Sequence, residues 1–260
     1  MKPDQEAKSR SQERFGQFAE RYVTSQSHAK GSDLDRLFEI ANPQADWLVL
    51  DVATGGGHTA LKFAPHVQSV IASDLTFKML AAAKEFIRGK AGRNVTFELA
   101  EAEHLPFASD CFDLVTCRIA PHHFSDCAGF IREGQRVLKE GGMLLVQDHL
   151  LPEDQTAARL IDAFERLRDP SHQRAFSRSE WVGMFEQGGL QVVHTQEILK
   201  RHDLLPWAGR QGCSAETLAQ LREMIKTAPP PAADWFEGEA LDTLEASFCN
   251  HHLLIAGRRM

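Results

Sequence analysis

The sequence has few of the features that mark secreted, membrane or nucleic-acid-binding proteins. No apolar run is long enough to span a membrane, and residues 1–20 are polar and charged rather than signal-like. The five cysteines are scattered and contain no C-x-x-C pair, which disfavours a disulfide framework or a zinc site and predicts a cytoplasmic location. Acidic residues outnumber basic ones by 36 to 29, without a long basic run, so we do not expect nucleic acid as the main partner.

The chain also lacks the G-x-G-x-x-G pattern of dinucleotide sites, although it contains a glycine-rich turn. Residues 47–57 read WLVLDVATGGG, in which an apolar run ends at Asp51 and three glycines follow at 55–57. Helix-like spacing begins at His58, so the segment reads as a buried strand followed by a tight turn and a helix. Glycine lets a ligand approach the backbone closely, and the start of the helix directs N–H groups at that ligand.

A second apolar segment, 69–73, ends in Asp74, which stands 23 residues after Asp51. Nucleotide-binding α/β units place a carboxylate at a spacing of roughly 20 residues, where it meets a ribose hydroxyl. The acidic Asp51 would repel a pyrophosphate, but it suits a ligand that carries positive charge. These residues therefore predict a site for a cationic cofactor of the adenosine type.

The 260 residues are of ordinary globular composition, with 43% hydrophobic and 25% charged residues, and suffice for one large α/β domain with a lid. Apolar strand patterns alternate with helical patterns over 47–148, which indicates a doubly wound, parallel sheet with helices on both faces. We predict an N-terminal helical lid (1–42), a cofactor-binding α/β core (43–151), and a C-terminal part of the same domain with substrate-pocket insertions and the last two strands (152–260).

Several element boundaries follow from the local pattern. A helix over 125–139 is expected to stop at Gly141-Gly142, before a strand over 143–148. Pro229-Pro230-Pro231 predicts a stiff polyproline step, and residues 236–249 fit a helix or a hairpin equally well. Further predicted elements include helices over 33–41, 154–168, 176–188 and 215–226 and strands over 95–100, 190–198 and 251–257.

Five segments in order resemble motifs of class I S-adenosylmethionine (SAM) methyltransferases of the UbiE-like group, which includes quinone-biosynthesis C-methyltransferases. The turn DVATGGG resembles the family's D-x-G-x-G-x-G loop, with Ala53 in place of the first glycine. The resemblance implies a Rossmann-like seven-stranded sheet in the order 3-2-1-4-5-7-6, with the last strand antiparallel. The other segments are VIASDLTFKML (70–80), ELAEAEHLPF (98–107), FDLVTCRIAPHHF (112–124) and RVLKEGGMLLVQD (136–148).

The resemblance also implies SAM as the cofactor and S-adenosylhomocysteine as its product. The family binds the ribose at the position of Asp74 and contacts the adenine at the positions of Glu101 and Ala102. Structural roles stay open beside these, such as an ion pair for Arg118 and a lid anchor for Tyr22. The cofactor-binding residues that we infer are Asp51, Ala53, Thr54, Gly55, Gly57, Asp74, Leu75, Glu101, Ala102, Arg118, Ile119 and Tyr22.

His122 and His123 follow the strand over 112–117, at the sheet edge where ligands gather in open α/β folds. A neutral imidazole can take a proton from a substrate hydroxyl, and the rate should then rise with pH through a pKa near 6.5. Adjacent residues cannot both point at one target, so we expect at least one of the pair to be structural and favour His123 as the base. Transfer by proximity alone, with both histidines as pocket lining, stays open. The histidines lack ligand spacing such as H-x-x-x-H, so we expect no metal.

The sequence therefore predicts methyl transfer from SAM to carbon or oxygen of a small organic acceptor, for which a phenolic or quinone-like compound is one candidate. A dry apolar wall around the methyl group favours this transfer. Two alternatives stay open: a non-catalytic SAM- or ligand-binding module, and an enzyme of this fold that uses SAM for another chemistry. The sequence does not distinguish a monomer from a homodimer. The candidates for the wall are Ile119, Phe124, Trp181, Phe185 and Trp207.

Overall fold

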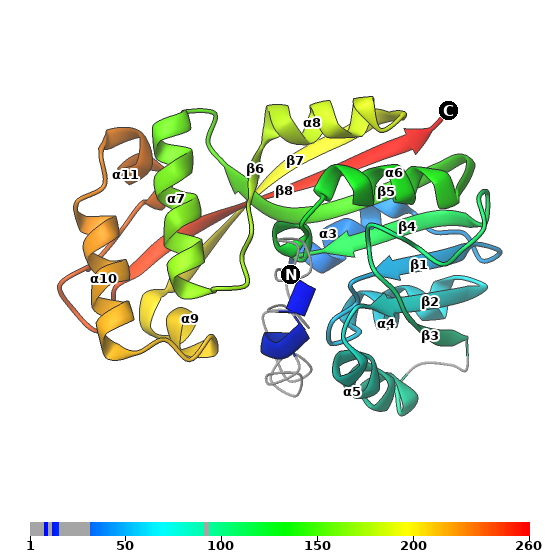
Figure 1. Cartoon of the computed structure of the whole chain (residues 1–260), viewed down its shortest axis with the longest axis horizontal. Coiled ribbons are helices and arrows are strands. Elements are labelled where there is room, and N and C mark those ends of the chain that lie inside the picture. The colour runs from blue at the N-terminus through cyan, green and yellow to red at the C-terminus, as the bar shows by residue number, and fades with distance from the viewer. Residues whose placement is uncertain (1–7, 10–11, 16–31, 91–93) are drawn as a thin grey trace.

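The computed structural model describes residues 8–9, 12–15, 32–90 and 94–260. Within these residues, one eight-stranded sheet has the order β3-β2-β1-β4-β5-β8-β7, and the short β6 pairs with β5 (Figure 1). Strands β1 to β5 are parallel, whereas β8 runs antiparallel to both β5 and β7. The strands are β1 (Leu48–Val52), β2 (Ser69–Asp74), β3 (Val95–Leu99), β4 (Phe112–Arg118), β5 (Leu138–Leu151), β6 (Phe176–Ser177), β7 (Leu190–Asp203) and β8 (Ser247–Arg259).

This architecture confirms the predicted Rossmann-like α/β fold. Counted without β6, the observed strand order is the expected 3-2-1-4-5-7-6, and the last strand is antiparallel. The two-residue β6 was not predicted, because its residues were assigned to the following helix. That helix, α8 (Arg178–Gln187), begins later because the Ser177 side chain accepts a hydrogen bond from the Glu180 N–H in a capping box.

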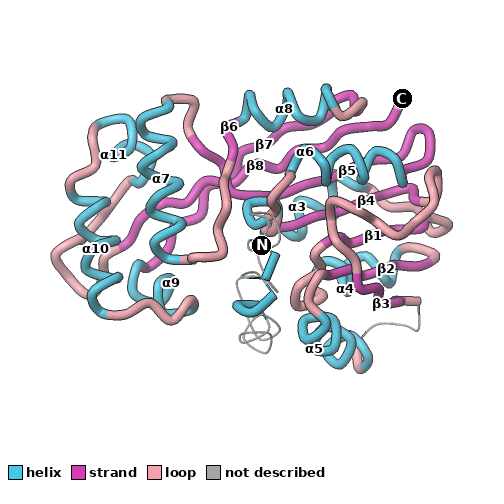
Figure 2. The backbone as a smooth tube through the Cα atoms, in the orientation of Figure 1, coloured by secondary structure: helices cyan, strands magenta, loops and turns pink. Residues whose placement is uncertain are grey.

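Helices cover both faces of the sheet (Figure 2). On one face, α6 and α8 pack on β1, β4 and β5 through a core that includes Phe130 and Trp181. On the other face, α3, α4 and α5 pack through Leu37, Phe63 and Ile87. Burial on both faces explains why the central strands appear in the sequence as nearly continuous apolar runs. These helices are α3 (Ser32–Ala41), α4 (His58–Phe63), α5 (Phe77–Arg88) and α6 (Cys127–Val137).

A third apolar core lies beyond the shorter strands, on the left in Figure 1, where β5, β7 and β8 extend past their neighbours. Phe164, Trp207 and Phe248 meet in this core. Strands β5 and β7 have 14 residues each, against 5 in β1, so a continuous sheet carries this helical part. Among the described residues, no helix is long and apolar enough to cross a membrane. The helices here are α7 (Gln155–Arg168), α9 (Leu204–Arg210), α10 (Ala215–Lys226) and α11 (Pro230–Phe236).

Two local predictions were wrong. Helix α6 ends at Val137, because Leu138 is already extended and pairs with Phe112 of β4. Gly141, with a φ of +75°, therefore lies inside β5 and does not cap a helix. The expected polyproline step is instead the start of α11 at Pro230, where the missing proline N–H has no helical partner to lose.

The parallel strands direct their carboxyl ends to one edge of the sheet. Strand β1 lies between β2 and β4, which is the point where the strand order reverses. Loops that follow β1, β2 and β4 therefore gather at this switch point, where open α/β sheets bind their ligands.

Candidate active site

A cavity of about 1050 Å³, including the open space at its mouth, lies at this edge of the sheet. Its walls come from the turns after β1, β2, β3 and β4 and from the described N-terminal residues. Residues inferred from the sequence that line it are Ala53, Thr54, Gly55, Asp74, Leu75, Glu101, Ala102, Arg118, Ile119 and His123.

The turn after β1 depends on unusual backbone angles. Ala53, Gly55 and Gly57 have φ values of +52°, +53° and +80°, in the left-handed region that favours glycine. Ala53 thus adopts a conformation suited to the glycine that the family motif has there. Gly57 does not line the cavity; a Cβ atom on it would lie 2.8 Å from Ile87 Cδ1, so this glycine lets the turn pack against α5.

Asp51 lies at the end of β1 and is almost fully buried, with 1% of its surface exposed. Its two carboxylate oxygens accept hydrogen bonds from the hydroxyls of Thr54 (2.6 Å) and Thr116 (2.8 Å). Burial raises the pKa of Asp51 to about 6, against the opposing effect of these two hydroxyls. Asp51 does not line the cavity, so the structure gives it a role in holding the turn, and its contact with a cofactor stays a prediction.

Asp74 lies at the end of β2 and lines the cavity. One oxygen accepts from the Gly55 N–H at 3.0 Å, and the other accepts from the Thr76 N–H at 2.9 Å. Burial raises the pKa of Asp74 to about 6, although these N–H groups favour the charged form. Each carboxylate oxygen has a further lone pair, so Asp74 can still accept from a ligand hydroxyl.

The turn after β4 is strained and tied to its neighbours. Ile119 has a φ of +55°, which is rare for a β-branched residue and typical of functional sites. Its N–H donates to the Gln147 carbonyl on β5 at 2.7 Å, which holds this conformation. Arg118 donates to Asp33 at 2.9 Å, so the ion pair that was left open as its alternative role is formed, although Arg118 also lines the cavity.

Described N-terminal residues lie across the cavity. The Lys8 ammonium is 3.0 Å from Glu101 and 3.1 Å from Glu103, and the Gln12 amide donates to the Leu75 carbonyl at 3.1 Å. Lys8 itself lines the cavity, as does Phe15, whose ring meets His123 edge-on at 4.9 Å between centroids.

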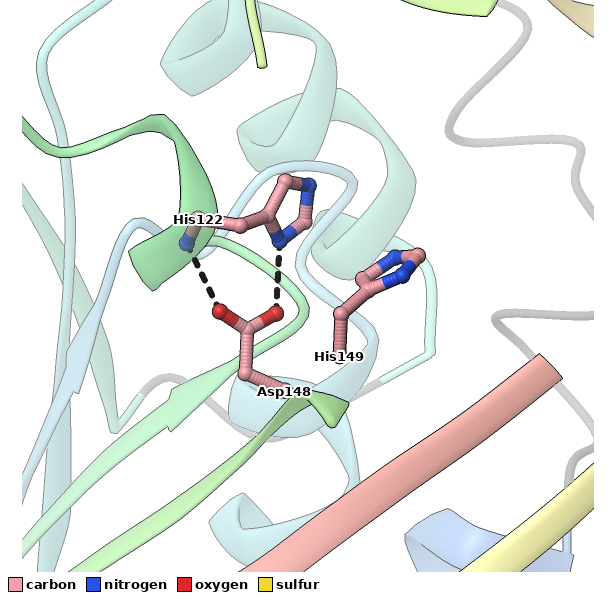
Figure 3. A group of neighbouring side chains, drawn as sticks. All are labelled: His122, Asp148 and His149. Atoms are coloured by element: carbon pink, nitrogen blue, oxygen red, sulfur yellow. Dashed lines mark hydrogen bonds and ion pairs between the residues drawn. The ribbon is translucent and has the colours of Figure 1, made fainter. Parts of the chain in front are cut away.

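His123 lines the cavity, whereas His122 does not line it and is buried. The Nδ1 atom of His123 lies 3.1 Å from the Ser171 carbonyl, which can only accept, so Nδ1 carries the proton and Nε2 is the acceptor nitrogen. His122 Nδ1 lies 2.6 Å from Asp148 Oδ1 (Figure 3). Burial, followed by the positive charge of His122, holds the pKa of His123 well below its ordinary value.

Comparison with known proteins shows the family to which the chain belongs. The family described as "Methyltransferase domain" matches residues 50–146, a range that holds the glycine turn and Asp74. The Bacillus subtilis protein named "Uncharacterized methyltransferase YcgJ" is 38% identical over 249 residues, which are 94% of this chain and 96% of YcgJ. The chain belongs to the class I SAM-dependent methyltransferases.

A solved methyltransferase structure from Bacillus halodurans is similar to this methyltransferase over most of its fold. Its TM-score is 0.84 at 37% identity, and the match covers 88% of this chain and 99% of the other. The ubiquinone/menaquinone C-methyltransferase UbiE of Cellvibrio japonicus is 35% identical over 121 residues, which is 45% of this chain and 48% of UbiE. The similarity to UbiE is therefore limited to about half of each protein.

The structure also shows which site residues of this methyltransferase the sequence did not reveal. Lys8, Phe15 and Glu103 line the cavity, and their approach depends on long-range contacts that carry no local sequence signal. Trp181, Phe185 and Trp207 belong to the hydrophobic cores and do not line the cavity, which leaves Ile119 and Phe124 from the expected apolar wall. Tyr22 lies outside the described residues.

The fold brings three potential metal ligands together: His122, Asp148 and His149, whose donor atoms all lie within 4.8 Å of one another. Sequence spacing therefore no longer argues against a metal. However, His122 Nδ1 and Asp148 Oδ1 share a hydrogen bond of 2.6 Å, so each already satisfies the other. We accordingly treat this group as a hydrogen-bonded pair with a neighbouring imidazole, and the expectation that no metal binds stays a prediction.

Proposed function

We propose that this methyltransferase methylates an oxygen or carbon atom of a small organic acceptor, with His123 as the general base. The observation that carries the proposal is the position of His123, which lines the cavity and keeps Nε2 as its acceptor nitrogen. A base placed there can take the proton of an acceptor hydroxyl and leave an oxygen or a ring carbon with more nucleophilic character. A phenolic or quinol-like acceptor fits this requirement.

The cavity residues fit SAM. The turn over 53–57 offers backbone without bulky side chains, and Asp74 offers a carboxylate for the ribose hydroxyls. Bound SAM supplies a methyl carbon that is electrophilic because a sulfonium carries it. Ile119, Phe124 and Phe15 form apolar wall and exclude water, which suits a reaction in which positive charge disappears. Most of the acceleration would then come from holding the acceptor atom opposite the sulfur, in line with the bond between the methyl carbon and the sulfur, worth roughly 7–11 kcal/mol.

We assign the three predicted parts of the chain to three tasks. Residues 43–151 hold the cofactor turns. Residues 1–42 act as the lid, which the contacts of Lys8 and Phe15 at the cavity support. Residues 152–260 determine the acceptor, because the loop after α7 reaches His123 through Ser171.

Formation of S-adenosylhomocysteine tests the proposal. The purified protein is incubated with SAM and a panel of phenols, catechols and quinols, and the products are identified by mass spectrometry. We expect turnover with at least one acceptor class and a mass gain of one methyl group on carbon or oxygen. Tight SAM binding with no product from any acceptor would instead favour the binding module, and a product without the methyl group would favour another chemistry.

Replacing Asp74 with alanine should weaken SAM binding by about 1.5–3 kcal/mol, the size of hydrogen bonds to a charged acceptor. The ribose hydroxyls favour the charged carboxylate, so wild-type affinity should rise as the pH increases through the Asp74 pKa of about 6. Calorimetry between pH 5 and pH 8 measures both effects, and Asp74→Asn serves as the isosteric control without this titration. Unchanged affinity together with a collapse of thermal stability would show that Asp74 only holds the turn.

A further inference from the structure

A buried charged pair stands directly behind the proposed base. Asp148 of β5 accepts two hydrogen bonds from His122, one from the backbone N–H at 2.7 Å and one from Nδ1 at 2.6 Å (Figure 3). Both residues are buried, with 1% and 5% of their surfaces exposed. The His122 carbonyl accepts from the backbone N–H groups of Gln173 and Arg174, so this residue is held from three directions.

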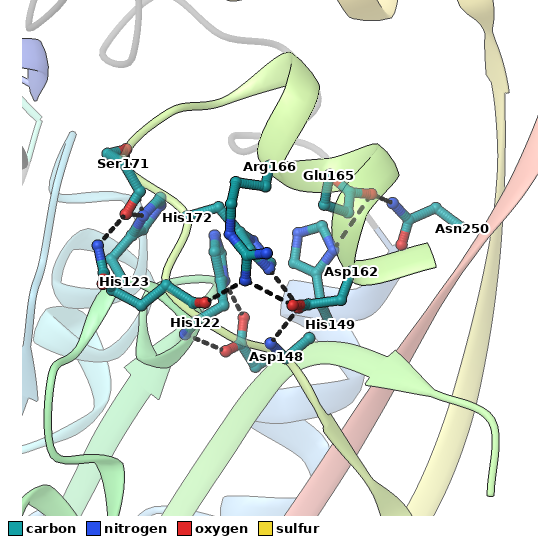
Figure 4. Close-up of polar contacts among 12 residues, drawn as sticks. His122, His123, Asp148, His149, Asp162, Glu165, Arg166, Ser171, His172 and Asn250 are labelled. Atoms are coloured by element: carbon teal, nitrogen blue, oxygen red, sulfur yellow. Dashed lines mark hydrogen bonds and ion pairs between the residues drawn. The ribbon is translucent and has the colours of Figure 1, made fainter. Parts of the chain in front are cut away.

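The ring of His123 is held by its two neighbours in space. Its centroid lies 4.0 Å from that of His122, and its Nδ1 donates to the Ser171 carbonyl (Figure 4). Ser171 is fixed in turn, because its hydroxyl donates to Asp169 at 2.5 Å. The Ser171 carbonyl therefore fixes the tautomer of His123, and the charged imidazole of His122 lies against its ring.

We propose that Asp148 and His122 are positioning residues that hold His123 as a neutral base on the cavity wall. This inference rests on the proposed role of His123. Asp148 keeps the proton on His122, and the positive charge of His122 at 4.0 Å opposes a second proton on His123. His123 then keeps the Nε2 lone pair that it needs to accept a proton, even when the solution becomes mildly acidic.

The pKa shifts of the two histidines agree with this geometry. Burial alone would lower the pKa of His122, but the Asp148 carboxylate outweighs burial and holds that pKa above its ordinary value. Burial and then His122 lower the pKa of His123, and Asp169 opposes them. The other groups that face the two histidines are His149 from β5, Glu165 from α7, His172 from the loop after α7, His252 from β8 and, through Asp169, Arg14 from the N-terminal segment.

A nuclear magnetic resonance titration of the histidine rings in the full-length protein tests the inference without an acceptor. In Asp148→Asn, His122 loses its counter-charge and its proton, so the pKa of His123 should rise toward the ordinary histidine value. His122→Gln removes the positive charge while keeping a hydrogen-bond donor for Asp148, and it should also raise the pKa of His123. The signal of His123 is assigned from its loss in His123→Phe.

Asp162→Asn is the matched control. Asp162 also pairs with a buried imidazole, His172, at 2.7 Å, but the ring of His172 contacts His122 rather than His123. The pKa of His123 should change less in this variant than in Asp148→Asn. An unchanged His123 titration in folded Asp148→Asn and His122→Gln would overturn the inference, as would an equal movement in the control.

The rate profile separates this inference from the proposed function. If both hold, the acidic limb of turnover should move to higher pH in Asp148→Asn, together with the His123 titration. If the titration moves and the rate profile does not follow it, the pair still sets the protonation of His123, but His123 is not the base.

Discussion

Turnover should fall by roughly 10²–10⁴ when His123 is replaced by alanine, while the affinity for SAM stays within a few-fold of the wild-type value. The reason is that the variant loses the Nε2 lone pair of His123, a residue that lines the cavity, whereas Asp74 and the turn over 53–57 are untouched. The measurement compares steady-state kinetics with the acceptor found by screening and calorimetry with SAM alone.

His123→Phe is the matched variant for this prediction. It keeps an aromatic ring against His122 and Phe15 and so preserves the packing, but it has no nitrogen to accept a proton. Both variants should lose turnover to a similar extent, and added imidazole should restore part of the activity only in His123→Ala, where truncation leaves room. If His123→Phe retained its rate within a few-fold, packing alone would explain the histidine and the base would lie elsewhere.

The pH dependence of the wild-type rate follows from the same residue. Because the pKa of His123 is well below its ordinary value, the base is already neutral at pH 7. Turnover should therefore be flat through neutral pH, and its acidic limb should lie below the value of about 6.5 that the sequence suggested. The deviation has a physical cause that the sequence does not contain, namely the burial of His123 beside a charged His122.

The second large effect is expected at Gly57, where alanine should reduce the free energy of unfolding by about 2–5 kcal/mol. A φ of +80° is unfavourable for alanine by about 1–2 kcal/mol. The new Cβ would also lie 2.8 Å from Ile87 Cδ1 and 3.2 Å from Ala83 Cβ, and overpacking of this kind typically adds about 1–3 kcal/mol. Urea unfolding monitored by circular dichroism measures the loss.

Gly141→Ala separates the two contributions. Gly141 has a similar φ of +75°, but a Cβ there would have no heavy atom within 4 Å, so only backbone strain should appear. Trimming the obstructing methyl in Gly57→Ala/Ile87→Val should recover part of the steric loss, as a double-mutant cycle would show. Equal losses in the two glycine variants would mean that α5 moves aside freely and that Gly57 is needed only for its backbone angle.

The parts of the fold that the sequence revealed are those with a local signature. The apolar run over 47–50 and the glycine turn are adjacent in the sequence, and Asp74 follows Asp51 at a spacing typical of nucleotide-binding folds. In the structure, Gly55 of the turn donates a 3.0 Å hydrogen bond to Asp74. The strand order followed from the resemblance to a family. In contrast, the start of α11 at Pro230 was missed because the three consecutive prolines were interpreted as a polyproline step, although proline is compatible with the first turn of a helix.

The candidate site was less predictable, because its chemistry depends on residues far apart in the chain. Asp148 stands 26 positions after His122, and nothing in either segment indicates their 2.6 Å contact. The link between His123 and Ser171 crosses 48 positions. Asp51 was assigned to the cofactor from its place in the motif, whereas its oxygens face Thr54 and Thr116, two hydroxyls whose partner only the folded sheet determines.

Because β8 lies between β5 and β7, the sheet can be completed only after this last strand has been synthesised. During synthesis, β5 emerges about a hundred residues before the strand that will cover its edge. Until then its apolar face and unpaired backbone are a template for pairing with other chains, and β7 cannot join the sheet because β8 is its sole strand partner among the described residues. Such long-range pairing is slow, so the edge of β5 stays open to other chains until β8 has been synthesised and has paired with it.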